Sequence, residues 1–232
     1  MPRLTEEMEF KKLISTFSTK SACYFCLSPT DAAWCKQCDF DFIKHSLRCP
    51  KCAKPHYGPT ICGKCIVSPP LFCTTTVLFN YAYPVKKIVL NFKFGKRAEL
   101  ATLFSDRLLD KIISKGKLPE TLVPVPLHKK RQAQRGYNQS LELAKHLAKK
   151  LGIPVNTNLC KRIVNTDPQS ELPIKSRQKN VKDAFALNND NIPKHIAIID
   201  DVITTGSTIN EISKLFKKAG CERIDIWAIA RT

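Results

Sequence analysis

The sequence lacks any apolar run long enough to span a bilayer, although 43% of its 232 residues are hydrophobic. We also expect no secretory leader, because Glu6, Glu7 and Glu9 stand where such a leader would carry an apolar stretch. No Gly-Lys-Ser or Gly-Lys-Thr occurs, which excludes a Walker A loop. We therefore expect a cytoplasmic protein that does not insert into membranes.

Acidic residues are scarce, since 20 aspartates and glutamates face 38 lysines and arginines. The resulting formal net charge of +18 predicts attraction to polyanions. An enzyme acting on a small molecule needs no such excess, so the charge favours a nucleic-acid partner, in particular single-stranded DNA.

Cysteines, in contrast, are abundant, and in a cytosolic chain their CxxC spacing indicates metal binding rather than disulfides. Four CxxC pairs occur: Cys23/Cys26, Cys35/Cys38, Cys49/Cys52 and Cys62/Cys65. A structural Zn²⁺ takes four thiolates at about 2.3 Å and leaves no open coordination position. Four pairs therefore predict two structural zinc sites.

The four pairs can combine in two ways. Sequential pairing places the first two pairs on one ion and the last two on another, and it closes shorter loops at lower entropic cost. Cross-braced pairing of first with third and second with fourth is the alternative, and a redox role for one pair is a competing reading. Cys73, Cys160 and Cys221 lie outside the pattern and are interpreted as small hydrophobic residues.

Aromatic and basic residues are interleaved with the cysteine pairs, for example Trp34, Phe40 and Lys51. Such residues can stack on single-stranded nucleic acid and neutralise its phosphates. The alternative is that the aromatic rings only fill a small core held by metal.

The most informative segment is residues 196–208, an apolar run that ends in Asp200 and Asp201 and leads through a turn into a helix. At the carboxyl end of a strand, two carboxylates suit a ribose diol or a Mg²⁺ ion. The turn can receive a phosphate, because hydroxyls, a glycine and helix-start N–H groups converge there. Its residues are Thr204, Thr205, Gly206, Ser207 and Thr208. The alternative is a strand, turn and helix with an ordinary polar N-cap.

Two further segments carry chemistry. Residues 124–139 combine a proline-stiffened loop with a cationic cluster that can receive a pyrophosphate, unless it is only a solvated basic face. The candidate cations are Lys129, Lys130, Arg131 and Arg135. Residues 162–180 are long, polar and without regular pattern, which favours a lid over the site or else a mobile surface loop.

Strand and helix patterns alternate after the cysteine pairs. Strands are predicted near residues 72–81, 121–125, 159–163, 184–187, 196–201 and 223–230, and helices near 84–92, 99–114, 140–151 and 209–219. This order implies an α/β fold with a mainly parallel sheet flanked by helices. We predict a helix at residues 1–20, a zinc-binding module at 21–68, a linker at 68–70 and the α/β domain at 71–232.

Residues 196–208 resemble the phosphoribosyl pyrophosphate (PRPP) signature of type I phosphoribosyltransferases: an apolar strand, an acidic pair, an apolar residue and Thr-Thr-Gly-Ser-Thr. From about residue 21 onward, the chain resembles the ComF family of competence-related proteins. Besides the cysteine pairs and the PRPP signature, the matching residues are Pro124-Val125-Pro126-Leu127, Arg135-Gly136-Tyr137-Asn138-Gln139, Gln169, Arg177, Asn180-Val181 and Ala184-Phe185.

The resemblance implies a type I phosphoribosyltransferase fold behind a zinc-binding module. It implies PRPP bound with Mg²⁺, with Asp200 and Asp201 as candidate catalytic residues and Arg177 among the PRPP contacts. It also implies a role in natural transformation, in which the protein handles incoming single-stranded DNA with a translocating helicase of the ComFA kind.

Three hypotheses follow. The first is a competence factor that binds single-stranded DNA, with PRPP as a ligand or regulator. The second is an active phosphoribosyltransferase that transfers ribose 5-phosphate from PRPP to an unidentified base or nucleic-acid acceptor. The third is a structural adaptor for a helicase with a silent PRPP pocket. The net charge favours the first hypothesis, and the intact acidic pair and turn favour the second over the third.

Overall fold

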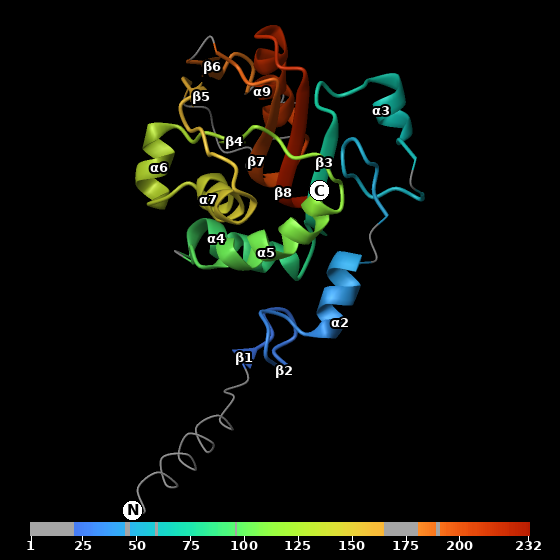
Figure 1. Cartoon of the computed structure of the whole chain (residues 1–232). Helices are drawn as coiled ribbons and strands as arrows, with labels where there is room; N and C mark the ends of the chain where they lie inside the picture. Colours follow the sequence, from blue (N-terminus) through green and yellow to red (C-terminus); the bar gives the residue numbers. More distant parts are fainter. Residues whose placement is uncertain (1–20, 45–46, 59, 96, 165–180, 189–190) are drawn as a thin grey trace, which may run out of the picture. The chain divides into compact units, whose positions relative to one another are not determined.

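The computed structural model describes residues 21–44, 47–58, 60–95, 97–164, 181–188 and 191–232 (Figure 1). The chain divides into two compact units, Met1–His45 and Ser46–Thr232. The helix predicted at residues 1–20 and most of the expected lid, residues 165–180, lie outside the described residues. Within the described ranges, no helix is long and apolar enough to cross a membrane.

The first unit is a small cysteine-rich fold with an aromatic interior. Its elements are the antiparallel strands β1 (Ser21–Ala22) and β2 (Pro29–Thr30), helix α2 (Lys36–Asp39) and the π-helix η1 (Phe40–Lys44). Trp34 is 3% exposed, and its Nε1 donates to Asp39 Oδ1 at 2.9 Å. The ring of Phe25 lies 5.7 Å from that of Trp34 and 4.9 Å from that of Phe42. Trp34 therefore belongs to the core and is not displayed for stacking.

A four-stranded parallel sheet forms the centre of the second unit. Its strands, in spatial order, are β3 (Thr74–Asn80), β8 (Arg223–Arg231), β7 (His195–Ile203) and β4 (Thr121–Pro124). The two central strands are apolar and buried on both faces, as expected for strands covered by helices. This confirms the predicted mainly parallel α/β sheet and places the acidic end of β7 in the middle of it.

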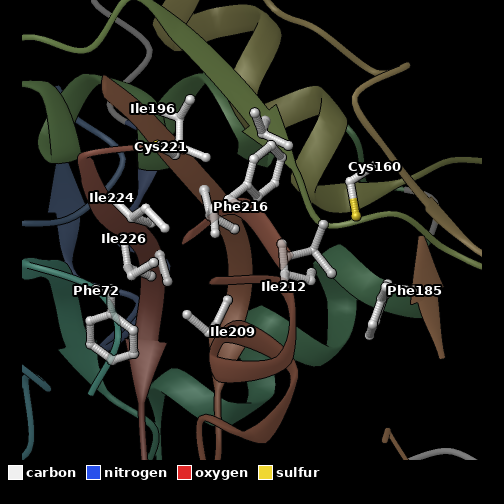
Figure 2. Packing of buried hydrophobic residues seen from close by; sticks show 14 of the residues in the cluster. Phe72, Cys160, Phe185, Ile196, Ile209, Ile212, Phe216, Cys221, Ile224 and Ile226 are labelled. Atoms are coloured by element: carbon white, nitrogen blue, oxygen red, sulfur yellow. The ribbon is translucent and has the colours of Figure 1, made fainter. Parts of the chain in front are cut away.

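Helices flank this sheet (Figure 1). The helices of the second unit are α3 (Gly63–Val67), α4 (Val85–Phe94), α5 (Leu100–Ile113), α6 (Lys129–Arg135), α7 (Gln139–Leu151) and α9 (Ser207–Lys218). On α9, the side chains of Ile209, Ile212 and Phe216 recur at helical spacing and pack against isoleucines of β7 and β8 (Figure 2). Burial of this apolar stripe holds the start of α9 beside the end of β7.

Two short strands form a separate ribbon outside the central sheet. β5 (Cys160–Arg162) pairs antiparallel with β6 (Phe185–Leu187). Cys160 and Phe185 are buried in the same hydrophobic cluster as α9 (Figure 2). Both predicted strands are therefore present, and they pair with each other rather than with the sheet.

The third and fourth cysteine pairs belong to the second unit, because the chain around them is bonded to the central sheet. Thr75 on β3 donates its N–H to the carbonyl of Pro50 at 3.2 Å and its hydroxyl to that of Lys51. Ala53 is 1% exposed and lies in the core of the second unit. The compact division consequently falls at residue 45, whereas the sequence predicted a boundary between 68 and 71.

The turn before α7 is tied to the end of β4 through Asn138. The Asn138 Oδ1 atom accepts hydrogen bonds from the N–H groups of Ser140 at 3.0 Å and Leu141 at 3.4 Å, which caps the helix. Its Nδ2 donates to the carbonyl of Val125 at 3.1 Å. Gly152, with φ of 68°, ends the helix as predicted.

We expect Asn138→Ala to lower the free energy of unfolding by roughly 2–3 kcal/mol, because it removes the cap and leaves the Val125 carbonyl unpaired. Asn138→Ser keeps a capping oxygen but cannot reach Val125, so its loss should be about half as large. Urea denaturation measures both values. Equal stability of the alanine variant and the parent protein would contradict this assignment.

Candidate functional site

The acidic pair lies at the carboxyl end of β7 and is contacted from two helices. Asp200 Oδ1 accepts hydrogen bonds from the N–H of Asp201 at 2.8 Å and from the hydroxyl of Ser140 on α7 at 3.4 Å. Asp201 is 8% exposed, and its Oδ1 lies 2.9 Å from Lys93 Nζ on α4. The fold thus brings a hydroxyl and an ammonium group to two adjacent carboxylates.

The environment of Asp200 disfavours its negative charge. Burial raises the pKa of Asp200 to about 7, and repulsion by Asp201 adds to this effect. Attraction to Lys93 and hydrogen bonds from Asp201 and Ser140 oppose it. A carboxyl group that titrates near neutrality gains from any ligand that brings hydroxyl donors or positive charge.

The turn between β7 and α9 has backbone and side-chain features that are typical of anion-binding sites. Gly206 adopts the left-handed conformation with φ of 83°, which leads directly into the helix and leaves no side chain over its first N–H groups. The hydroxyl oxygens of Thr205 and Ser207 lie 2.7 Å apart, and the Ser207 N–H donates to Thr205 Oγ1 at 3.3 Å. Hydroxyls and helix-start N–H groups therefore converge at one place, beside the acidic pair.

The predicted cationic cluster lies on helix α6, which the sequence analysis described only as a loop followed by cations. His128 caps this helix by accepting the Lys130 N–H at its Nδ1, at 3.3 Å, and Gly136 ends it with φ of 79°. Lys129 and Lys130 are exposed, whereas Arg131 is partly buried.

Arg135 and Arg162 extend this cationic region toward the acidic pair. The Arg135 guanidinium lies 5.0 Å above the ring of Phe94 and donates to Gln139 Oε1 at 3.1 Å. Burial and, to a smaller extent, repulsion by Arg131 and Arg135 lower the pKa of Arg162 to about 10, and attraction to Asp200 opposes this shift. Arg162, on β5, thus shares an electrostatic environment with α6 and the acidic pair.

The end of α4 is held against the turn that precedes α7. The hydroxyl of Tyr137 donates to the Phe92 carbonyl, and Gln139 Nε2 donates to the Lys93 carbonyl at 3.1 Å. Tyr137 and Gln139, two residues of the Arg-Gly-Tyr-Asn-Gln motif, therefore position Lys93. The sequence analysis did not name Lys93 or Arg162 as a site residue. Lys93 is one of three lysines on α4, and nothing local distinguishes it from Lys86 or Lys87.

Each sequential set of four cysteines forms a compact sulfur cluster. The first cluster is Cys23, Cys26, Cys35 and Cys38, and the second is Cys49, Cys52, Cys62 and Cys65. Within each, all sulfur atoms lie within 4.8 Å of one another, which could hold a metal ion and matches sequential pairing.

Backbone N–H groups surround the most buried sulfur of each cluster. Cys23 Sγ accepts from the N–H groups of Phe25 at 3.5 Å and Cys35 at 3.3 Å, and Cys49 Sγ accepts from that of Cys62 at 3.4 Å. Such donors stabilise metal-bound thiolates, so both clusters fit a structural ion. Cys160, by contrast, lies in the hydrophobic core, where burial raises the pKa of its thiol to about 12.

Comparison with known proteins agrees with this architecture. Residues 138–232 match the phosphoribosyl transferase domain family. Competence protein F of Haemophilus influenzae is 38% identical over 198 residues, which cover 82% of this chain and 86% of that protein. The DNA utilization protein YhgH of Salmonella typhimurium is 33% identical over 219 residues, covering 90% and 96%, respectively. Competence protein ComFC of Streptococcus pneumoniae is 28% identical over 228 residues, covering 95% and 96%.

Among solved structures, a purine phosphoribosyltransferase from Pyrococcus horikoshii is similar, with 20% identity and a TM-score of 0.35 over 56% of this chain and 80% of that chain. The matched domain and the parallel sheet flanked by helices identify a type I phosphoribosyltransferase fold in the second unit. The fold predicted from the sequence is therefore confirmed.

The raised pKa of Asp200 predicts a pH-dependent gain in stability for Asp200→Asn. In the unfolded chain an aspartate ionises near pH 3.9, whereas in the folded protein Asp200 ionises near 7, so its charge increasingly opposes folding from about pH 4 to 7. The variant should therefore gain roughly 2.5 kcal/mol more over the parent protein at pH 8 than at pH 5. Urea denaturation at both values tests this.

Asp110→Asn, at an exposed position of α5, is the matched control and should show no such pH dependence. A gain for Asp200→Asn that is equal at both pH values would mean that another effect of the amide, and not removal of the charge, stabilises the protein.

Proposed function

Because this chain belongs to the family of competence protein F and the DNA utilization protein YhgH, we propose that it binds PRPP and single-stranded DNA and supports DNA uptake or handling in natural transformation. One observation carries the PRPP part, namely the acidic pair beside the glycine turn that starts α9. The names of the relatives and the net charge of +18 support the DNA part. A cytoplasmic location and a helicase partner of the ComFA kind belong to the same proposal.

In this proposal, each part of PRPP has a chemically matched partner. The 5′-phosphate binds the turn at residues 204–208, and the ribose hydroxyls donate to Asp200 and Asp201. The pyrophosphate binds the cations on and near α6, which are Lys129, Lys130, Arg131, Arg135 and Arg162. Mg²⁺ bound with PRPP would offset the remaining negative charge. Arg177 lies outside the described residues and stays a predicted contact.

We also propose that the two cysteine clusters hold Zn²⁺. Four thiolates complete a tetrahedral coordination sphere, so each ion would stabilise its fold without supplying catalysis. The first cluster would act within the first unit and the second within the phosphoribosyltransferase unit.

A second candidate function is catalysis, which the intact acidic pair favours. In ribosyl transfer, the bond from ribose C1 to the pyrophosphate oxygen breaks, pyrophosphate leaves with the electron pair, and an acceptor nitrogen bonds to C1. Positive charge develops on the ribose, and the carboxylates of Asp200 and Asp201 would stabilise it. The acceptor would be a base or a nucleic acid.

Asp201→Asn should weaken PRPP binding at least about 100-fold, because the carboxylate that receives ribose hydroxyls and accompanies Mg²⁺ is lost. Isothermal titration calorimetry with Mg²⁺ measures the affinity, and Asp110→Asn serves as the exposed-acid control. Retained affinity in the folded variant would remove Asp201 from the PRPP site.

Pyrophosphate release separates the two candidate functions. The protein is incubated with Mg²⁺ and PRPP, alone and with bases, nucleotides or single-stranded DNA, and Asp200→Ala/Asp201→Ala is the blank. Release above that blank would make the protein an enzyme and would identify its acceptor. Binding without release would favour a PRPP-responsive nucleic-acid factor.

Binding of single-stranded DNA should depend steeply on salt, because phosphate contacts release counterions. Between about 50 and 200 mM salt we expect the affinity of an oligonucleotide to fall by about 10³-fold, as for a site of six or more phosphate contacts. Fluorescence anisotropy measures this fall. A flat salt response would count against a DNA-binding role carried by the positive charge.

A further inference from the structure

The second cysteine cluster faces the turn at residues 204–208, which is proposed to bind phosphate. A pocket of about 160 Å³ separates them, and residues of both line it. The cluster contributes Cys52 and Cys65, and the turn contributes Thr205, Gly206 and Ser207. The second cysteine cluster and the turn thus line the same pocket within the second unit.

Arg231, at the end of β8, connects the two. Its Nε donates to the carbonyl of Cys52 at 3.1 Å, inside a CxxC turn of the cluster. Its Nη1 donates to the carbonyl of Ile203 at 3.0 Å and to that of Thr204, where β7 passes into the phosphate turn. Because one planar guanidinium makes all three bonds, displacement of Cys52 would disturb the carbonyls at the base of the turn.

The turn lies close to this arginine. A Cβ atom at Gly206 would lie 3.9 Å from Arg231 Nη2 and 3.9 Å from Ile203 Cγ2. The carbonyls of Ile203 and Thr204 are held toward Arg231, and the peptide units that follow carry the N–H groups proposed to face phosphate. The guanidinium therefore acts on the turn through its carbonyls.

The charge of Arg231 also favours an occupied metal site. The side chain is 4% exposed, and among the described residues no carboxylate forms an ion pair with it. A buried cation needs a compensating charge. Four thiolates around a divalent ion carry a net negative charge, and the Cys52 carbonyl of this cluster already accepts a hydrogen bond from Arg231 Nε at 3.1 Å.

We propose that Arg231 is a positioning residue that couples the metal in the second cysteine cluster to the phosphate turn, so that loss of this metal weakens phosphate binding. The effect on PRPP affinity rests on the proposed function, whereas the effect on the order of the turn does not. The first cluster belongs to the other compact unit, and its metal should not affect the turn.

Four variants test the coupling: Cys62→Ser in the second cluster, Cys26→Ser in the first as the matched control, Arg231→Met, and Cys62→Ser/Arg231→Met. Metal content is measured by mass spectrometry, and PRPP affinity with Mg²⁺ by calorimetry. Each cysteine variant should lose one metal ion per chain. Cys62→Ser and Arg231→Met should each weaken PRPP binding about tenfold, whereas Cys26→Ser should leave it unchanged.

The double variant decides whether Arg231 carries the effect. If it does, Cys62→Ser should add almost nothing in the Arg231→Met background, because the connection is already broken. Fully additive losses would overturn the proposal, as would an equal loss in Cys26→Ser. If Cys62→Ser does not fold, Arg231→Lys, which keeps the charge but cannot make three bonds, should keep its metal and still bind PRPP more weakly than the parent protein.

Hydrogen–deuterium exchange at residues 203–208 provides a readout that needs no PRPP. Exchange in this turn should be faster in Cys62→Ser and Arg231→Met than in the parent protein and unchanged in Cys26→Ser. If the parent protein fails to bind PRPP but exchange follows this order, the proposed function fails and the coupling stands. Unchanged exchange in both Cys62→Ser and Arg231→Met would overturn the coupling.

Discussion

Two adjacent carboxylates at the end of a buried central strand repel each other, and the surrounding structure compensates for that repulsion. Lys93 pairs with Asp201, and the Ser140 hydroxyl and a backbone N–H stabilise the charge of Asp200. Lys93 lies on α4 and Ser140 on α7, and hydrogen bonds from residues 137–139 tie the start of α7 to the ends of β4 and α4. The acidic pair can therefore stay poised for a ligand only while these elements remain docked.

Each cysteine cluster consists of two successive CxxC pairs, but the two clusters differ in their surroundings. The first is accompanied by its own aromatic interior around Trp34. The segment that holds the second is too short to bury a core alone, and it uses β3 and β8 of the central sheet instead. A metal in the first cluster would hold a small module together, whereas a metal in the second would support one wall of the pocket beside the turn at residues 204–208.

Elements with a strong local pattern were predicted correctly from the sequence. A helix was predicted at residues 209–219, where α9 spans Ser207–Lys218, and the apolar run before Asp200 predicted β7. Helix α6 was not predicted, because its residues are almost all polar and give no apolar period; its cap at His128 and its end at Gly136 define it instead. The compact division at residue 45 differs from the predicted boundary at residues 68–71, because the contacts of residues 50–53 with the sheet leave no mark in their spacing.

The sequence by itself determined the features whose groups are close together along the chain. These are the CxxC pairs, the adjacent carboxylates and the turn of residues 204–208 that follows them. Only the tertiary structure decided which distant groups meet these features. Lys93 reaches Asp201 across the fold, and Arg231 reaches Cys52 from 179 residues away. The reason is that the sheet order β3–β8–β7–β4 makes neighbours of strands that are far apart in the chain, and a contact across such neighbours depends on burial and register rather than on spacing along the sequence.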